Sequence, residues 1–142
     1  MSAVPPPQLQ APHVVGVIDS DPDARARIGS LLQPVGIEVL PFESAETYLL
    51  SGSGRSLACL IVDLLLPGMS GLELLRRLRA LGSDVPVILL ADESDVPTAV
   101  AAMREGATDF IEKPYVNVAV LKQVRKLLRQ EQQDDIPGAL PV

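Results

Sequence analysis

The stretch DFIEKP, residues 109–114, places Lys113 directly after a short apolar run and completes a pattern that begins far upstream. Asp19 closes the earlier apolar run VVGVI, and Asp63 closes the run LIV. Short apolar runs of this kind are typical of parallel strands that are buried on both faces. The carboxyl ends of such strands meet at one edge of the sheet, where α/β proteins bind their ligands, so we expect the three charged side chains to gather there.

Apolar runs alternate with segments of helical period along most of the chain. We predict strands near residues 14–18, 37–40, 58–62, 86–90 and 108–111, and helices near residues 22–33, 44–50, 71–81, 96–105 and 116–130. Asp21 before Pro22 marks a helix start, because an acid caps the helix and proline suits its first position. The alternation predicts an α/β fold: a flavodoxin-like (βα)5 doubly wound parallel sheet of strand order 2-1-3-4-5, provided every crossover is right-handed.

Composition sets limits on the class of protein. The chain has 142 residues, 47% of them hydrophobic and 3% aromatic, which suits one domain with an aliphatic core. A net charge of −6 argues against nucleic acid as a direct partner, because neutralising phosphates needs a basic face. A single cysteine, Cys59, excludes an internal disulfide and a zinc site with several thiolates, and we expect it to be a small core residue.

The two ends of the chain differ in character from its middle. Residues 1–13 are rich in proline and predict a disordered tail, and residues 131–142 predict a flexible tail or linker. The domain itself is expected to span residues 14–130. No run approaches the roughly 20 apolar residues of a membrane span, and the N-terminus lacks the basic and apolar regions of a secretory signal. We therefore expect a cytoplasmic protein without membrane contact.

The motifs LPGMSG at residues 66–71 and GATDFIEKP at 106–114, with their spacing from Asp63, resemble the receiver domain of two-component response regulators, particularly the FixJ type. The resemblance covers roughly residues 14–129. It implies a signalling module, not an enzyme, in which Asp63 accepts a phosphoryl group from a histidine kinase or a phosphotransfer protein. It further implies that Lys113 pairs with the phosphoryl oxygens, and that the bond between Lys113 and Pro114 is cis.

The resemblance also implies Mg²⁺, held by Asp19, Asp63 and the backbone carbonyl of Leu65. Receivers usually carry two consecutive acids at the end of the first strand, whereas here Ser20 follows Asp19. We expect Asp21 to cap the next helix instead of binding metal. Mg²⁺ is often held by only one or two carboxylates, with water completing the shell, and Ser20 can offer a neutral oxygen. We therefore predict weakened Mg²⁺ binding.

A second departure lies at the end of the fourth predicted strand. Receivers resemble one another in having Thr or Ser there, and this chain has Ala91. A hydroxyl bond to a charged acceptor is worth roughly 1.5–3 kcal/mol, so its loss predicts weakened switching. Phe110 occupies the place of the receiver switch aromatic, which turns inward on activation. The small Ala91 leaves room for an inward Phe110 without phosphorylation, although a plain core phenylalanine is the alternative interpretation.

Two other functions remain open. A degenerate pseudo-receiver would signal by protein–protein contact without phosphorylation. A haloacid-dehalogenase-type phosphatase would use the D-x-D formed by Asp19 and Asp21, although Ala91 stands where that family carries a hydroxyl. Turnover of a generic phosphate ester with Mg²⁺ would separate this enzyme from a receiver. Dinucleotide binding is disfavoured, because no G-x-G-x-x-G follows the first strand.

The resemblance also implies protein partners. It implies an output domain or protein partner, in keeping with transcription regulation, and a homodimer through the fourth helix, fifth strand and fifth helix. The expected contributors to that face are Ala101, Arg104, Val116, Val118 and Ala119. FixJ-type receivers commonly precede a DNA-binding domain, but no recognition helix is evident in these 142 residues.

Overall fold

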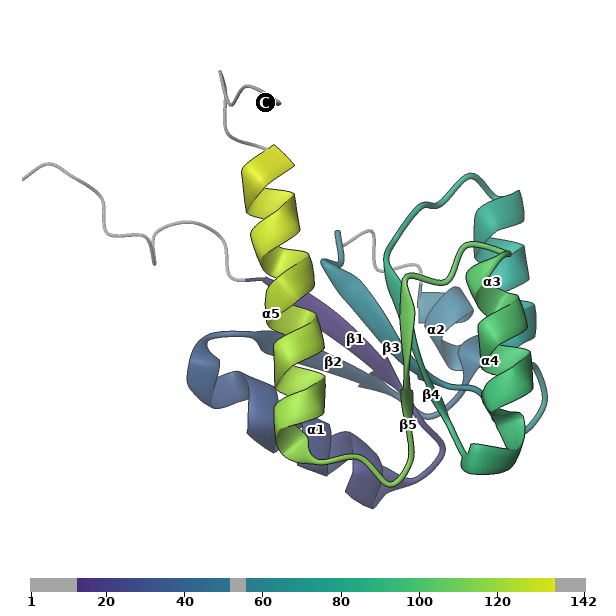
Figure 1. The fold of residues 1–142 in the computed structure, drawn as a ribbon, viewed down its shortest axis with the longest axis horizontal. Helices are drawn as coiled ribbons and strands as arrows, with labels where there is room; N and C mark the ends of the chain where they lie inside the picture. The colour runs from purple at the N-terminus through teal and green to yellow at the C-terminus, as the bar shows by residue number, and fades with distance from the viewer. Residues whose placement is uncertain (1–12, 52–55, 135–142) are drawn as a thin grey trace, which may run out of the picture.

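The computed structural model describes residues 13–51 and 56–134 (Figure 1). In this part of the chain, five strands pair in parallel to form one sheet of order β2-β1-β3-β4-β5. The strands are β1 (Val14–Ile18), β2 (Glu38–Phe42), β3 (Cys59–Asp63), β4 (Val87–Ala91) and β5 (Asp109–Glu112). The order and the pairing confirm the flavodoxin-like prediction.

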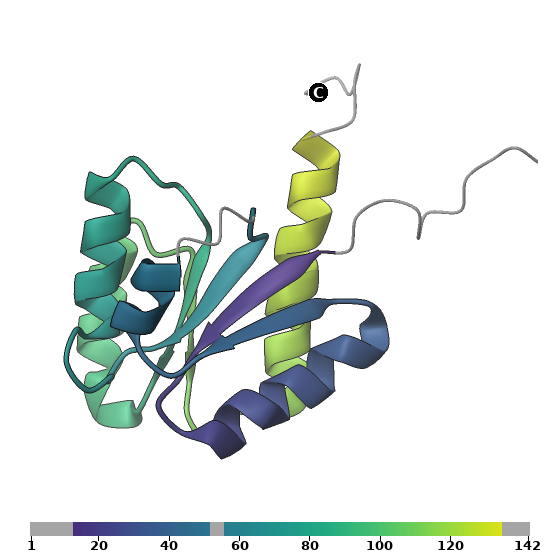
Figure 2. The same cartoon turned by 180° about the vertical axis from the view of Figure 1, so that it is seen from behind.

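Helices cover both faces of the sheet. They are α1 (Pro22–Leu32), α2 (Ala45–Ser51), α3 (Gly71–Ala80), α4 (Val96–Met103) and α5 (Asn117–Asp134), with short 3₁₀ turns at η2 (Gln33–Val35) and η3 (Glu93–Asp95). Figures 1 and 2 show α1 and α5 on one face, and α2, α3 and α4 on the other. Across the residues that the structure describes, no helix combines the length and the apolar character that crossing a bilayer requires.

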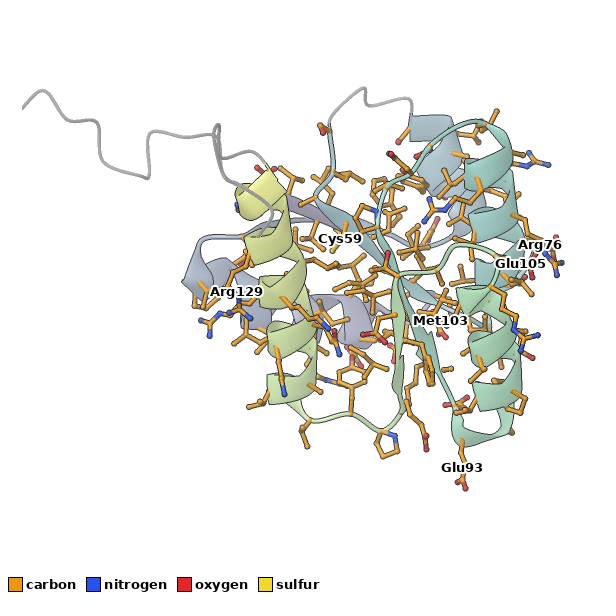
Figure 3. All side chains as sticks on the ribbon, turned by 45° about the horizontal axis from the view of Figure 1, so that its top comes forward. Cys59, Arg76, Glu93, Met103, Glu105 and Arg129 are labelled. Atoms are coloured by element: carbon orange, nitrogen blue, oxygen red, sulfur yellow. The ribbon has the colours of Figure 1, made fainter. Side chains whose placement is uncertain are left out.

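The core consists of two layers, one on each side of the sheet. Successive side chains of a strand point to opposite faces, so β3 sends Leu60 and Val62 toward α2, α3 and α4 and sends Cys59 and Ile61 toward α1 and α5. β1, β3 and β4 are buried along their whole length, which accounts for their apolar sequences, with Asp63 at the end of β3 as the exception. Cys59 is fully buried, as predicted (Figure 3).

Several predicted boundaries were wrong by one or two residues. β2 continues through Pro41 to Phe42, past the predicted end at residue 40, because it is an edge strand and does not need the amide of Pro41 for a second neighbour. β3 and β4 each end one residue later than predicted. Asp63 and Ala91 are therefore the last residues of their strands, still fixed by pairing to the sheet.

The C-terminal helix was also predicted too short. α5 runs to Asp134, four residues beyond the predicted end at 130, and so includes the first four residues of the predicted C-terminal tail. The run EQQD at residues 131–134 consists mostly of good helix formers, which extend a helix already docked on the sheet. The remaining predicted tail residues, 1–12 and 135–142, lie outside the described residues.

Candidate functional site

Asp63 lies at the carboxyl edge of the sheet, where β3 ends. Only 8% of its surface is exposed. Its Oδ2 lies 3.1 Å from Nζ of Lys113, and its Oδ1 accepts a long hydrogen bond of 3.3 Å from the amide of Leu65. Each carboxylate oxygen therefore has a donor, and the ion pair joins residues 50 positions apart.

Asp19 lies beside Asp63 because β1 and β3 are neighbours, with Ile18 in register with Val62. Only 3% of its surface is exposed, and its Oδ1 accepts a 3.0 Å hydrogen bond from the amide of Asp21. Burial raises the pKa of Asp19, and the negative charge of Asp63 raises it further, against the lowering effect of that amide bond. Two buried carboxylates thus share one end of the sheet.

Lys113 supplies the positive charge to this pair. Burial disfavours its ammonium, but the hydrogen bond to Asp63 and the attraction of Asp63, Asp19 and Asp92 outweigh burial and raise the pKa of Lys113. Its backbone amide donates to the carbonyl of Ala91 at 2.8 Å, so the end of β4 holds the residue that follows β5. The peptide bond between Lys113 and Pro114 is cis.

Asp21 has the capping position that the sequence predicted. Its carboxylate accepts from the amide of Asp23 at 2.9 Å, and Pro22 begins α1. Ser20 is exposed between the two acids. A contact that the sequence did not predict is that of Arg25, whose guanidinium donates to the backbone carbonyl of Asp19 at 2.5 Å and fixes the turn after β1.

The loop after Asp63 packs closely against it. A methyl group at Gly71 would lie 2.7 Å from the carbonyl oxygen of Asp63, so only glycine lets α3 begin this near the strand. Ser70 caps α3 by accepting from the amide of Glu73 at 3.1 Å. The motif LPGMSG therefore encodes a tight connection from the strand carrying Asp63 to its helix.

Ala91 and Phe110 lie on the face of the sheet covered by α2, α3 and α4. Ala91 is buried at the end of β4, in one cluster with Ala99 and Ala102. Phe110 is half-buried and packs against the same cluster. The ion pair of Asp63 and Lys113 therefore adjoins an apolar strand end, and no hydroxyl is present at position 91.

The donor set suits a hard divalent cation. Asp19 and Asp63 supply the one or two carboxylates through which proteins usually hold Mg²⁺, with water filling the remaining positions. Within residues 13–51 and 56–134, no group of three or more His, Cys, Asp and Glu side chains gathers as a metal cluster. The buried carboxylates of Asp19 and Asp63 repel each other, and a cation bound between them would offset this repulsion.

The sequence profile of the response regulator receiver domain matches residues 15–133. The chain belongs to the response regulator receiver family. Among curated proteins, it is 41% identical over 114 residues to the transcriptional regulatory protein FixJ of Azorhizobium caulinodans, covering 80% of this chain and 54% of that protein. It is 34% identical over 116 residues to the response regulator protein TodT of Pseudomonas putida, covering 82% and 51%. This receiver thus spans about half the length of these relatives.

Solved structures of receivers share the fold. Full-length FixJ from B. japonicum superposes with a TM-score of 0.78 at 36% identity, covering 83% of this chain and 58% of that one. A response regulator receiver protein from Pseudoalteromonas atlantica superposes with a TM-score of 0.76 at 33% identity, covering 83% and 98%. The second match shows that solved receivers include chains of about this extent.

Two arginines of α3 reach the loop after α4, which the sequence did not predict. Nε of Arg76 lies 2.6 Å from Oε1 of Glu105, and the two side chains meet at the edge of the molecule in Figure 3. Arg79 donates to the backbone carbonyl of Ser83, just after α3, at 3.0 Å and to that of Gly106 at 2.7 Å. These contacts tie α3 to the connection between α4 and β5.

Proposed function

We propose that this receiver domain accepts a phosphoryl group on Asp63 from the phosphohistidine of a histidine kinase or a phosphotransfer protein. The observation that carries the proposal is the contact of 3.1 Å between the buried carboxylate of Asp63 and the half-buried ammonium of Lys113. Asp19 lies beside Asp63, and its negative charge makes the ends of β1 and β3 suitable for a divalent cation. A surface salt bridge alone would not need a second buried carboxylate.

In the proposed transfer, an Oδ atom of Asp63 forms a bond to phosphorus while the bond between phosphorus and the donor histidine nitrogen breaks. Lys113 leaves its contact with the free carboxylate and follows the negative charge onto the phosphoryl oxygens. Asp19, Asp63 and the carbonyl of Leu65 would hold Mg²⁺, which neutralises phosphoryl charge when bound. The role of the protein is positioning and electrostatic stabilisation.

Metal binding is proposed to be weak. Ser20 replaces an acid that receivers usually have, and Asp21 uses its carboxylate on the amide of Asp23. The site is left with Asp19 and Asp63 as its carboxylates. A missing charged ligand lowers the affinity for Mg²⁺ without removing the minimum that this ion requires.

Switching is also proposed to be weak. Phosphorylation shifts a conformational equilibrium only through contacts that differ between the two states. Ala91 has no hydroxyl to bind the phosphoryl oxygen, and Phe110 already packs against the cluster that contains it. We infer that the phosphoryl group acts only slightly on α4 and β5, even when Asp63 is modified.

A pseudo-receiver that signals through phosphorylation-independent contact is the alternative that Ser20 and Ala91 favour. Mass spectrometry after incubation with Mg²⁺ and acetyl phosphate or phosphoramidate separates the two functions. A phosphorylated receiver gains one phosphoryl mass, whereas a pseudo-receiver gains none. A generic phosphate ester tested in parallel covers the dehalogenase-type phosphatase, which would release phosphate with turnover.

The association surface is proposed to be the face made by α4, β5 and α5. Val116 and Val118 are each 70% exposed at the start of α5, and Val100 and Met103 are exposed on α4. Exposed apolar side chains that lie together on one face are typical of a surface that another protein covers, and these four lie on or next to the two helices of the proposed face. We propose that this face binds a second copy or an output partner in the cytoplasm, by analogy with relatives that are named transcriptional regulators.

A further inference from the structure

The loop from Leu64 to Ser70 is held from outside by a side chain of α2. The amide of Met69 donates to Oε2 of Glu46 at 2.8 Å, although the two residues are 23 positions apart. Glu46 also lies against Gly68, where a methyl group would be 2.5 Å from the same oxygen. Gly68 has a φ of 74°, which glycine adopts freely, so the backbone turns directly onto the carboxylate.

The contact between Glu46 and Met69 lies in the same loop as Leu65, which follows Asp63 closely. The loop starts at Asp63, and its amide at Leu65 donates to the carboxylate of Asp63. It ends where the amide of Gly71 donates to the carbonyl of Leu64 at 2.9 Å. Glu46 holds the segment at Gly68 and Met69, between these two points. The proposed metal-binding carbonyl of Leu65 therefore lies in a loop with three anchors.

Glu46 is suited to hold a loop, because its own helix is fixed to the core. Ala45 is fully buried, and the ring of Tyr48 packs edge-on against Phe42 with centroids 5.3 Å apart. The hydrogen bond from Met69 lowers the pKa of Glu46, because the amide stabilises the charged form of the carboxylate. A charged acceptor on a fixed helix binds an amide more strongly than a neutral one does.

We propose that Glu46 is a positioning residue for the metal and phosphoryl site. Its carboxylate fixes the backbone at Gly68 and Met69 and thereby sets the direction of the Leu65 carbonyl beside Asp63. This inference rests on the proposed function of Asp63, but it concerns a residue outside the pocket. Partners that orient metal ligands from outside commonly change metal affinity when they are lost.

The test compares Glu46→Ala, Glu46→Gln and Glu43→Ala with the unaltered protein. Glu43 is an exposed acid just before α2, so Glu43→Ala removes the same charge without touching the loop. Mg²⁺ affinity is measured by NMR titration, and hydrogen exchange of the Met69 amide reports the anchor directly. Loss of such outer partners typically lowers metal affinity by about 10–100-fold. Because the contact of Glu46 is exposed, we expect Glu46→Ala to lower Mg²⁺ affinity by about tenfold.

Glu46→Gln keeps an acceptor oxygen and should bind Mg²⁺ nearly as well as the unaltered protein, as should Glu43→Ala. Equal affinity in Glu46→Ala, despite faster exchange of the Met69 amide, would overturn the positioning role and leave the proposed function intact. A similar loss in all three variants would assign the effect to long-range charge and overturn it as well. If the unaltered protein binds neither Mg²⁺ nor beryllofluoride, the proposed function itself fails, and the role of Glu46 fails with it.

Discussion

The carboxyl edge of the sheet has two parts that differ in how fully they keep the receiver pattern. The ends of β1, β3 and β5 bring Asp19, Asp63 and Lys113 together, with partners for each charge. The end of β4 presents the methyl group of Ala91 inside an apolar cluster. The first part has the groups on which the proposed phosphoryl transfer depends, and the second lacks the hydroxyl that we expect to bind the phosphoryl oxygen. Under the proposed function, acceptance and response depend on different strands, and one substitution should separate them.

The two parts also differ in what holds them. The acceptor part relies on charge: a raised pKa at Lys113 reflects three acids nearby, and the turn after β1 is fixed by Arg25. The part around β4 relies on apolar packing among Ala91, Ala99 and Phe110. Packing of this kind has no dependence on the charge at Asp63, which is why we expect it to remain unchanged when that charge changes.

The largest expected effect concerns the acceptor part. Asp63→Asn should abolish the phosphoryl adduct, because the amide that replaces the carboxylate is not a nucleophile toward phosphorus. The measurement is intact-protein mass spectrometry after incubation with Mg²⁺ and phosphoramidate. Asp23→Asn is the matched control, since Asp23 is an exposed acid of α1. A stable adduct that persists in Asp63→Asn would show that another residue is the acceptor.

The next prediction restores the response part. Ala91→Thr should supply a hydroxyl for the phosphoryl oxygen and make Phe110 and α4 respond to beryllofluoride. A bond of roughly 1.5–3 kcal/mol shifts a balanced equilibrium about 10- to 150-fold. The control is Ala91→Val, because valine has nearly the same shape as threonine but no hydroxyl. It therefore tests the effect of added bulk beside Phe110. The two parts are not separable as described if both variants respond equally in NMR spectra.

A smaller effect is expected at the metal. Ser20→Asp should tighten Mg²⁺ binding by adding a carboxylate beside Asp19, on the order of tenfold or about 1.4 kcal/mol. Ser20→Asn adds similar bulk without charge and should bind Mg²⁺ like the unaltered protein. Calorimetry can measure all three affinities. Equal affinity in Ser20→Asp and the unaltered protein would mean that Asp21 or another group already supplies that ligand.

The smallest effect concerns stability and pH. A carboxyl whose pKa is raised on folding favours the folded state as pH falls through that pKa, and opposes folding above it. Asp19→Asn should therefore raise the melting temperature at neutral pH in the absence of metal, with less gain at acidic pH. The asparagine Oδ1 can still accept from the amide of Asp21. A lower melting temperature at neutral pH would show that the charge of Asp19 is stabilising as it stands.

The sequence predicted the parts of the site that depend on strand ends. Asp19, Asp63 and Lys113 each follow or close an apolar run, and parallel order alone brings such residues to one edge. It did not predict the contacts of Arg25, Glu46, Arg76 and Arg79, because long side chains cross between elements in ways that no periodicity records. The position of Glu46 against Gly68 needs the relative placement of α2 and the loop after β3.

The predicted ends of β2 and α5 were wrong for a different reason. β2 was predicted to end at residue 40, but its edge position tolerates Pro41 within the strand. The polar residues after Arg129 suggested a tail, but the docked helix carries on through them to Asp134. In both cases, tertiary context overrode a local signal that is weak by itself.

The separation of acceptance from response is tested most directly by beryllofluoride. Amide and ring NMR spectra of the unaltered protein should be recorded with Mg²⁺, before and after addition of beryllofluoride. We predict that resonances of Asp63, Leu65 and Lys113 shift, while those of α4 and the ring of Phe110 stay close to their original positions. A full rearrangement of Phe110 and α4 in the unaltered protein would contradict this account, because it would show that the fold responds to the phosphoryl mimic without a hydroxyl at position 91.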